Sequence, residues 1–109
     1  MCGINGFNFK NENQIKLMND SIKHRGPDNS DIYLSDNLSL GHVRLSIIDL
    51  SIKASQPMFY CKNRGSIQNN NKLSYDSSFI SIVFNGEIYN YLELRNELIG
   101  YGYNFNTDS

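Results

Sequence analysis

The sequence predicts an α+β fold with largely antiparallel strands, and three observations support this prediction. Apolar residues recur at helical spacing in two stretches, over residues 12–23 and 90–99. Aromatic and β-branched residues gather in short runs, most clearly at residues 79–84. These stretches differ in type without the regular spacing of parallel βαβ units, so neighbouring strands are expected to pair antiparallel.

The N-terminal part is predicted to form a strand and then a helix. Apolar residues among small and polar ones predict the first strand at residues 4–9. Asn11 or Asn13 is suited to cap a helix over residues 12–23, because a short polar side chain accepts a hydrogen bond from the first turn. Gly26-Pro27 ends this helix. Its apolar stripe consists of Ile15, Met18 and Ile22.

A hairpin is predicted next, with strands at residues 31–34 and 38–43 joined by Ser35-Asp36-Asn37. Residues 45–50 are mostly apolar without a clear period, and Gln56-Pro57-Met58 is predicted to break the chain.

Residues 62–78 are polar and rich in Asn and Ser, which predicts a solvated loop between two strands. Residues 79–84 are the clearest strand, and Asn85-Gly86 turns the chain after it. Asn90, with Glu93 three residues on, predicts a capping box for a helix to about Ile99. Leu94 and Leu98 line the apolar face of this helix, and Gly100 and Gly102 are predicted to end it. Phe105 is predicted to begin another strand.

Composition argues against several classes of partner. The formal net charge is −1 and no basic run occurs, so neither nucleic acid nor an anionic membrane surface is an expected partner. No apolar run approaches the roughly 20 residues of a membrane-spanning helix, and no secretory signal is recognisable, so a cytoplasmic protein with reduced thiols is expected. No metal site is expected, because zinc-ligand spacing is absent from Cys2, His24, His42 and Cys61.

Cys2 is the first candidate for chemistry. Removal of Met1 would give this residue a free α-amine beside its own thiol. An α-amine has a reference pKa of about 7.7–8.0, so its neutral fraction can take the thiol proton and leave the nucleophilic thiolate. An ordinary buried cysteine in a first strand is the alternative interpretation.

Four polar clusters lie where elements are predicted to end. His24-Arg25-Gly26-Pro27-Asp28 fits a plain helix stop. Arg44 is either a surface charge or a clamp for a carboxylate. Asn85-Gly86 fits a type I′ turn, or an oxyanion hole made by the Asn85 side-chain amide and the Gly86 backbone N–H. Glu87 beside them is able to hold an ammonium group, and Asp108 alone indicates nothing.

Several of these motifs occur together, and in the same order, in one enzyme family. They are Cys-Gly-Ile after Met1, HRGPD at 24–28, GHVRLSIIDLS at 41–51, QPM at 56–58 and FNGEIYNY at 84–91. On these motifs the chain resembles the glutaminase half of glutamine-hydrolysing asparagine synthetase, an N-terminal-nucleophile (class II) glutamine amidotransferase. The Cys-Gly start is shared across class II, whereas the other motifs in series are more specific to the asparagine synthetase branch. Only the Asn-rich insert at 62–78 falls outside the resemblance.

The resemblance implies a role for each matching residue. Cys2 would attack the glutamine side-chain amide, with its own α-amine as base, and Asn85 and Gly86 would stabilise the oxyanion. Arg44 would bind the α-carboxylate of glutamine. The α-amino group would contact Glu87 and Asp108. The remaining substrate-binding positions are Leu45, Ser46, Ile47 and Ile48, and HRGPD is interpreted as scaffolding.

The resemblance also implies a four-layer αββα sandwich with antiparallel sheets, the fold of N-terminal-nucleophile hydrolases. Residues 1–109 would supply the N-terminal part, beginning at Cys2 once Met1 is removed. Family members continue into a synthetase domain that is absent from this sequence. ATP and Mg²⁺ are expected in that domain, and no cofactor in this chain. Glutamine is the expected substrate, the missing synthetase domain the ammonia acceptor, and the full-length enzyme allows a homodimer.

Three functions remain open. The chain is the part of asparagine synthetase that supplies ammonia for ATP-dependent conversion of aspartate to asparagine, part of a related amidotransferase with another acceptor, or a non-catalytic remnant. The intact set of matching site residues argues against the remnant. The isolated chain is expected to aggregate and to show little glutaminase activity, because residues 79–84 would form an open strand edge.

Overall fold

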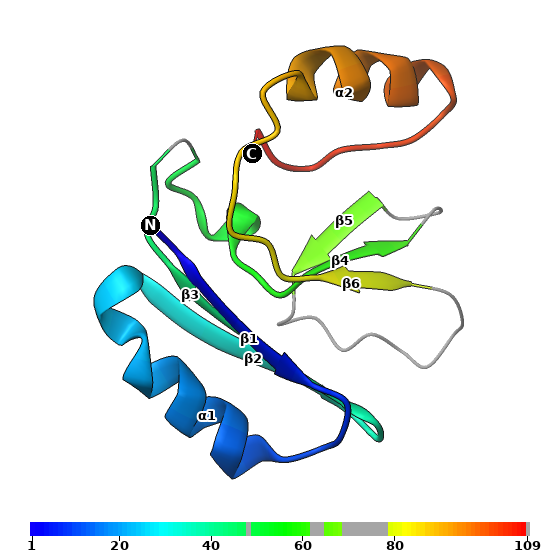
Figure 1. Cartoon of the computed structure of the whole chain (residues 1–109). Coiled ribbons are helices and arrows are strands. Elements are labelled where there is room, and N and C mark those ends of the chain that lie inside the picture. The colour runs from blue at the N-terminus through cyan, green and yellow to red at the C-terminus, as the bar shows by residue number, and fades with distance from the viewer. Residues whose placement is uncertain (48, 62–64, 69–78, 109) are drawn as a thin grey trace.

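The computed structural model describes residues 1–47, 49–61, 65–68 and 79–108, with the backbone alone for 65–68. Two antiparallel three-stranded sheets and two α-helices make up this part of the chain (Figure 1). The first sheet has the order β1-β3-β2, with strands Gly3–Phe7 (β1), Asn29–Ser35 (β2) and Leu38–Arg44 (β3). The second has the order β5-β4-β6, with strands Met58–Cys61 (β4), Gly65–Gln68 (β5) and Ile80–Ile82 (β6). The predicted α+β class with antiparallel strands is confirmed.

Helix α1 (Glu12–Ser21) covers one face of the first sheet. Asn11 is its cap, because the Asn11 side chain accepts a hydrogen bond of 3.0 Å from the backbone N–H of Gln14. The helix is shorter than the predicted span and gives way to the 3₁₀ turn η1 (Lys23–Arg25). Ile15 of α1 is fully buried. Gly41 permits the close approach, since a Cβ there would lie 2.4 Å from Asn19 Oδ1.

The predicted hairpin of β2 and β3 is confirmed, and both strands are longer than expected. Their register runs from Ser35 opposite Leu38 to Asn29 opposite Arg44. The main-chain ladder therefore continues into residues whose polar side chains gave no strand signal, because pairing with a neighbour decides where a strand ends. This extension makes Arg44 the last residue of β3.

The second sheet corrects two sequence predictions. Strand β5 lies within the predicted loop of residues 62–78, where it pairs with β4 as a hairpin; residues 62–64 and 69–78 of that loop lie outside the described part. Strand β6 is only half of the predicted strand 79–84. Its ladder with β4 ends where Met58 faces Ile82, because Pro57 follows next in register and has no N–H to donate.

The two sheets meet through aromatic side chains. Phe59 of β4 is fully buried, and its ring lies edge-on to Tyr33 of β2 with centroids 4.9 Å apart. Phe79, just before β6, completes the cluster at 5.7 Å from the Phe59 ring. In Figure 1 the elements follow one another as α1, first sheet, second sheet and the second helix α2.

Helix α2 (Tyr91–Gly100) lies beyond the second sheet, and none of its residues is buried. The predicted capping box is wrong, because the Asn90 side chain makes no capping hydrogen bond. The helix ends as expected at Gly100, and Gly102 adopts a φ of 89° that favours glycine. The predicted strand at Phe105 does not form, since residues 103–108 run as irregular chain.

Candidate active site

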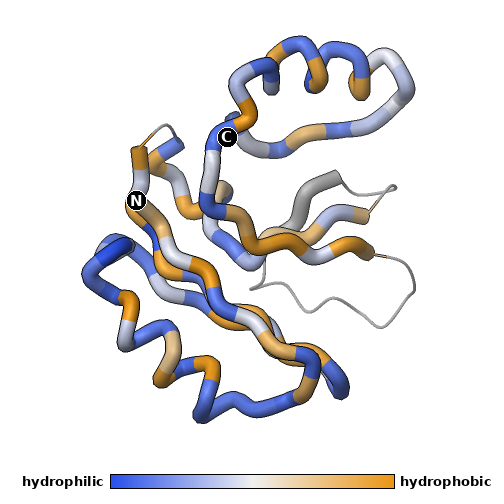
Figure 2. The backbone as a smooth tube through the Cα atoms, viewed as in Figure 1, coloured by the Kyte–Doolittle hydropathy of each residue, from blue (hydrophilic) through white to orange (hydrophobic). Residues whose placement is uncertain are grey.

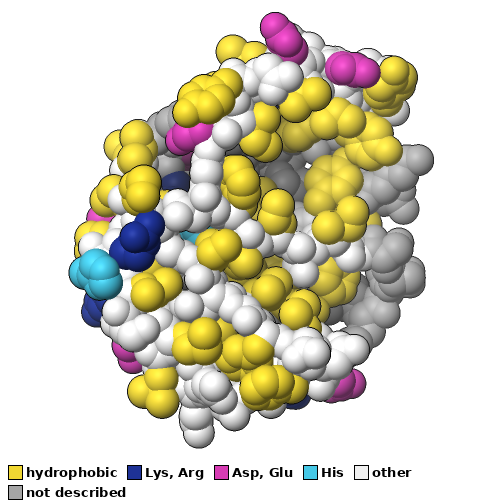
Figure 3. All heavy atoms as spheres, in the orientation of Figure 1, with side chains coloured by type: hydrophobic (Ala, Val, Ile, Leu, Met, Phe, Trp, Pro, Cys, Tyr) yellow, Lys and Arg dark blue, Asp and Glu magenta, His cyan; other side chains and the backbone are white. Residues whose placement is uncertain are grey.

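A pocket of about 490 Å³ lies between the end of β3, the segment that follows β6, and α2. Hydrophobic side chains gather on this face between β6 and α2 (Figure 3), and the tube in Figure 2 is apolar along β6. Most of the predicted site residues line this one pocket: Cys2, Arg44, Leu45, Ile47, Asn85, Gly86, Glu87 and Asp108. Ser46 does not line it, and Ile48 lies outside the described residues.

The Cys2 thiol is held against the end of β3. Its Sγ accepts a hydrogen bond of 3.3 Å from the backbone N–H of Leu45 and lies 3.6 Å from the Leu45 carbonyl oxygen. The pairing of Gly3 with Val43 in the first sheet fixes this alignment, because the same register continued past that pair places Cys2 beside Arg44, the residue before Leu45. Cys2 is partly exposed and lines the pocket, which argues against an ordinary buried cysteine.

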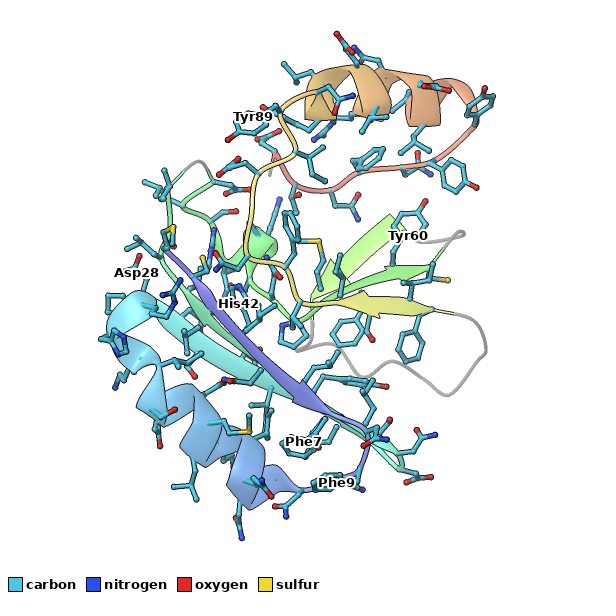
Figure 4. All side chains as sticks on the ribbon, in the orientation of Figure 1. Phe7, Phe9, Asp28, His42, Tyr60 and Tyr89 are labelled. Carbon is cyan, nitrogen blue, oxygen red and sulfur yellow. The ribbon has the colours of Figure 1, made fainter. Side chains whose placement is uncertain are left out.

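The HRGPD stretch supports the residues around Cys2. Arg25 donates from Nε to the Cys2 carbonyl oxygen over 3.1 Å. Asp28, labelled in Figure 4, accepts a hydrogen bond of 2.7 Å from the backbone N–H of Ser46. Gly26 lies so close to β3 that a Cβ there would be 2.4 Å from the Val43 carbonyl carbon. The arrangement favours scaffolding over a plain helix stop.

Arg44 is 8% exposed, so it is not a simple surface charge. Its Nη1 donates to the Ser51 carbonyl over 2.8 Å and to Ser55 Oγ over 3.5 Å, while Nη2 donates to the Asp49 carbonyl. A guanidinium has five N–H donors. Within the described residues, these bonds leave the Nε–H and one Nη2–H as donors for a carboxylate.

Asn85-Gly86 does not form the type I′ turn that was the alternative interpretation. Such a turn needs positive φ at both central residues, and Gly102 is the one glycine with positive φ among the described residues. The chain instead passes from β6 through Phe84 along the pocket and on into α2 (Figure 1). The Phe84 ring packs on Gly86, where a Cβ would lie 2.8 Å from Phe84 Cζ.

Besides His42 and Tyr91, three charged or polar pocket residues were not assigned a role from the sequence. Asp49 lies within the motif at 41–51, and its Oδ2 is 3.4 Å from the backbone nitrogen of Asp108. The hydroxyl and backbone N–H of Ser51 bond to Asp49 and hold its carboxyl pKa below the ordinary value. The other two are Gln56 and Arg95. Arg95 donates to the Thr107 carbonyl over 2.7 Å and so anchors the segment that carries Asp108. The sequence offered a signal for Asp49, as a charge inside an apolar run, and for Gln56, as the first residue of the QPM motif, but none for Arg95.

His42 lines the same pocket from β3 and is 1% exposed (Figure 4). Burial lowers the pKa of His42 to about 4. The positive charge of Arg44 also lowers this pKa, whereas the backbone of Phe84 raises it. The imidazole is therefore neutral at physiological pH, and its Nε2 makes no hydrogen bond to the described residues.

The described residues contain no group of three or more His, Cys, Asp or Glu side chains placed to hold a metal ion. None of the helices described here has the length and apolar character needed to cross a membrane.

Comparison with known proteins identifies the family. The sequence model of the glutamine amidotransferase domain matches residues 1–109. The chain belongs to the glutamine amidotransferase family. It is 42% identical over 117 residues to asparagine synthetase (glutamine-hydrolysing) 1 of Bacillus subtilis, covering 100% of this chain and 16% of the relative. It is 38% identical over 116 residues to asparagine synthetase B of Escherichia coli, covering 100% and 18%.

A protein of Methanocaldococcus jannaschii is 48% identical over 103 residues, which are 87% of this chain and 20% of that protein. This glutamine amidotransferase chain thus spans a fifth or less of the length of these relatives.

Proposed function

We propose that this amidotransferase chain hydrolyses the side-chain amide of glutamine with Cys2 as nucleophile. The α-amine of Cys2, freed of Met1, takes the thiol proton. The thiolate attacks the amide carbon, the C–N bond breaks, and the nitrogen leaves with the proton as ammonia. A γ-glutamyl thioester remains on Cys2, and water converts it to glutamate.

The observation that supports this proposal is the meeting of complementary groups in one pocket. A zwitterionic amino acid needs a cation for its carboxylate and anions for its ammonium group. Arg44, with two N–H groups left over, suits the first, and Glu87 and Asp108 suit the second. The Asn85 side-chain amide and the Gly86 N–H are the proposed oxyanion donors.

The order α1, sheet, sheet, α2 is compatible with one part of a four-layer αββα sandwich, which we propose as the complete fold. We further propose that the whole protein uses the ammonia for ATP-dependent synthesis of asparagine, because relatives of that name align over this chain. ATP and Mg²⁺ would then bind outside residues 1–109. A related acceptor other than aspartate is the alternative.

The experiment is an assay of ammonia and glutamate released from glutamine by the purified protein at its natural length. We expect equal amounts of the two products, and no release by Cys2→Ala. Binding of glutamine without ammonia release would instead support the non-catalytic alternative, and ammonia release by Cys2→Ala would exclude Cys2 as nucleophile.

A further inference from the structure

The main chain of Phe84 is held by the Gln56 side chain. Gln56 Oε1 accepts a hydrogen bond of 2.6 Å from the Phe84 backbone N–H, and Gln56 Nε2 donates one of 3.2 Å to the Phe84 carbonyl. One side-chain amide thus supplies both the acceptor and the donor that a neighbouring strand would otherwise provide.

The position of this contact follows from the register of the second sheet. Strand β4 pairs with β6 through Tyr60 opposite Ile80 and Met58 opposite Ile82. Two residues further along, the same register places Gln56 opposite Phe84. Pro57 stands between and has no N–H, so the main-chain ladder stops there. The Gln56 amide continues the pairing beyond that stop.

Gln56 is itself well anchored. Its neighbours in sequence, Ser55 and Pro57, are both buried, and Phe59 two residues beyond Pro57 is fully buried in the aromatic cluster between the sheets. Gln56 also lines the pocket. It therefore connects the rigid part of the second sheet to the segment that follows β6.

That segment carries the proposed oxyanion donors. Asn85 and Gly86 directly follow Phe84, and the Phe84 ring packs on Gly86. A donor displaced by about 1 Å loses much of its effect on the transition state, on the order of 10²-fold in rate. Because both the N–H and the carbonyl of Phe84 are held, the peptide group that joins Phe84 to Asn85 is restricted in orientation.

We propose that Gln56 is a positioning residue, whose amide fixes Phe84 so that Asn85 and Gly86 point at the developing oxyanion. The inference rests on the proposed glutaminase function, since the oxyanion is defined by that reaction. Gln56 needs no contact with glutamine for this role.

The first test uses Gln56→Met, which keeps the length of the side chain and removes both hydrogen bonds. We expect kcat for glutamine hydrolysis to fall on the order of 10–100-fold, as for other groups that orient a reacting residue. KM is expected to stay within about threefold, because an oxyanion exists only in the transition state. Gln14→Met, on the exposed face of α1, is the matched control and should match the unmodified protein.

The second test uses Gln56→Glu. Its ionised carboxylate accepts from the Phe84 N–H and opposes the Phe84 carbonyl, whereas its protonated form donates to that carbonyl. The ratio of kcat for Gln56→Glu to kcat for Gln56→Met should therefore rise as the pH falls. A purely structural role would leave this ratio constant.

Hydrogen exchange at the Phe84 amide provides a readout that does not depend on activity. We expect faster exchange in Gln56→Met than in the unmodified protein and in Gln14→Met. Unchanged exchange, or an unchanged kcat in a protein that hydrolyses glutamine, would overturn the proposal for Gln56 alone. If Phe84 exchanges faster in Gln56→Met but the unmodified protein releases no ammonia from glutamine, the proposed function is overturned, and the positioning role with it.

Discussion

The backbone N–H of Leu45 donates to Cys2 Sγ over 3.3 Å, between residues 43 positions apart in the chain. This contact follows from the antiparallel pairing of β1 with β3, which aligns Gly3 with Val43. The sheet thus brings the proposed nucleophile to the end of the strand that carries Arg44. Nucleophile and proposed carboxylate ligand are positioned by the same pair of strands.

Asn85 is expected to act on the chemical step. Asn85→Ala should lower kcat on the order of 10²–10³-fold with little change in KM, the usual loss for one oxyanion donor. Steady-state kinetics with glutamine provide the measurement. A variant that changed KM alone would show that Asn85 binds the ground state of the substrate instead.

Arg44 is expected to act on binding and on stability together. Arg44→Ala should mainly raise KM, because the carboxylate of glutamine is held in the ground and transition states alike. It should also lower the melting temperature, since the Ser51 and Asp49 carbonyls lose their donor. Kinetics well below the melting temperature separate the two effects. A lower melting temperature with an unchanged KM would leave Arg44 as a structural residue.

Sequence patterns predicted elements better than they predicted element ends. The helical stripe of Ile15 and the cap at Asn11 are local signals, and both appear in the structure. Strand β5 was missed because composition averages over a short strand among polar residues. The early stop of β6 depends on Pro57, which directly precedes β4, so the apolar pattern of residues 79–84 could not reveal it.

The sequence likewise predicted some residues of the candidate site and not others. Cys2, Arg44 and Asn85 lie in motifs whose residue types suit the chemistry, and the structure brings them to one pocket. Gln56 and Arg95 support neighbouring backbone through contacts between distant segments. A polar side chain that bonds to a distant main chain leaves no local pattern, so the sequence marked Gln56 only as part of the QPM motif and gave a role to neither residue.

His42 predicts a pH-dependent stability. Its pKa falls from 6.5 to about 4 on folding, so the unfolded chain binds its proton first and the free energy of unfolding decreases as pH drops from about 6.5 to about 4. The decrease totals about 3 kcal/mol at most, from about 1.4 kcal/mol per pKa unit. The charged groups nearest in the sheet are Asp31, opposite His42 in register, and Arg44.

Denaturant titrations between pH 7 and pH 4 measure this effect. His42→Gln should flatten the pH dependence in that range, whereas His24→Gln, at an exposed position, should not. Hydrogen bonds from Ser51 hold the pKa of the Asp49 carboxyl below its ordinary value, so this group responds at lower pH than His42. An equally steep profile for His42→Gln would assign the acid sensitivity to other groups.

The edge strand β6 predicts self-association of the 109-residue polypeptide. Ile80 is 72% exposed on a strand that pairs, among the described residues, with β4 alone. Exposed apolar edge strands recruit further strands, and a charge there opposes this. Ile80→Lys should shift the sedimentation profile toward the monomer. Leu17→Lys, at a similarly exposed site on α1, is the control and should leave the profile unchanged.

The most direct test of the proposed chemistry is mass spectrometry of the N-terminal peptide after a rapid acid quench during turnover of glutamine. We expect a peptide that begins at Cys2 and carries one glutamyl group as a thioester. The adduct should be absent from Cys2→Ala and from a variant in which a residue inserted before Cys2 blocks the α-amine. Turnover of glutamine by protein that retains Met1, or a glutamyl adduct on any other residue, would contradict the assignment of Cys2 as the N-terminal nucleophile.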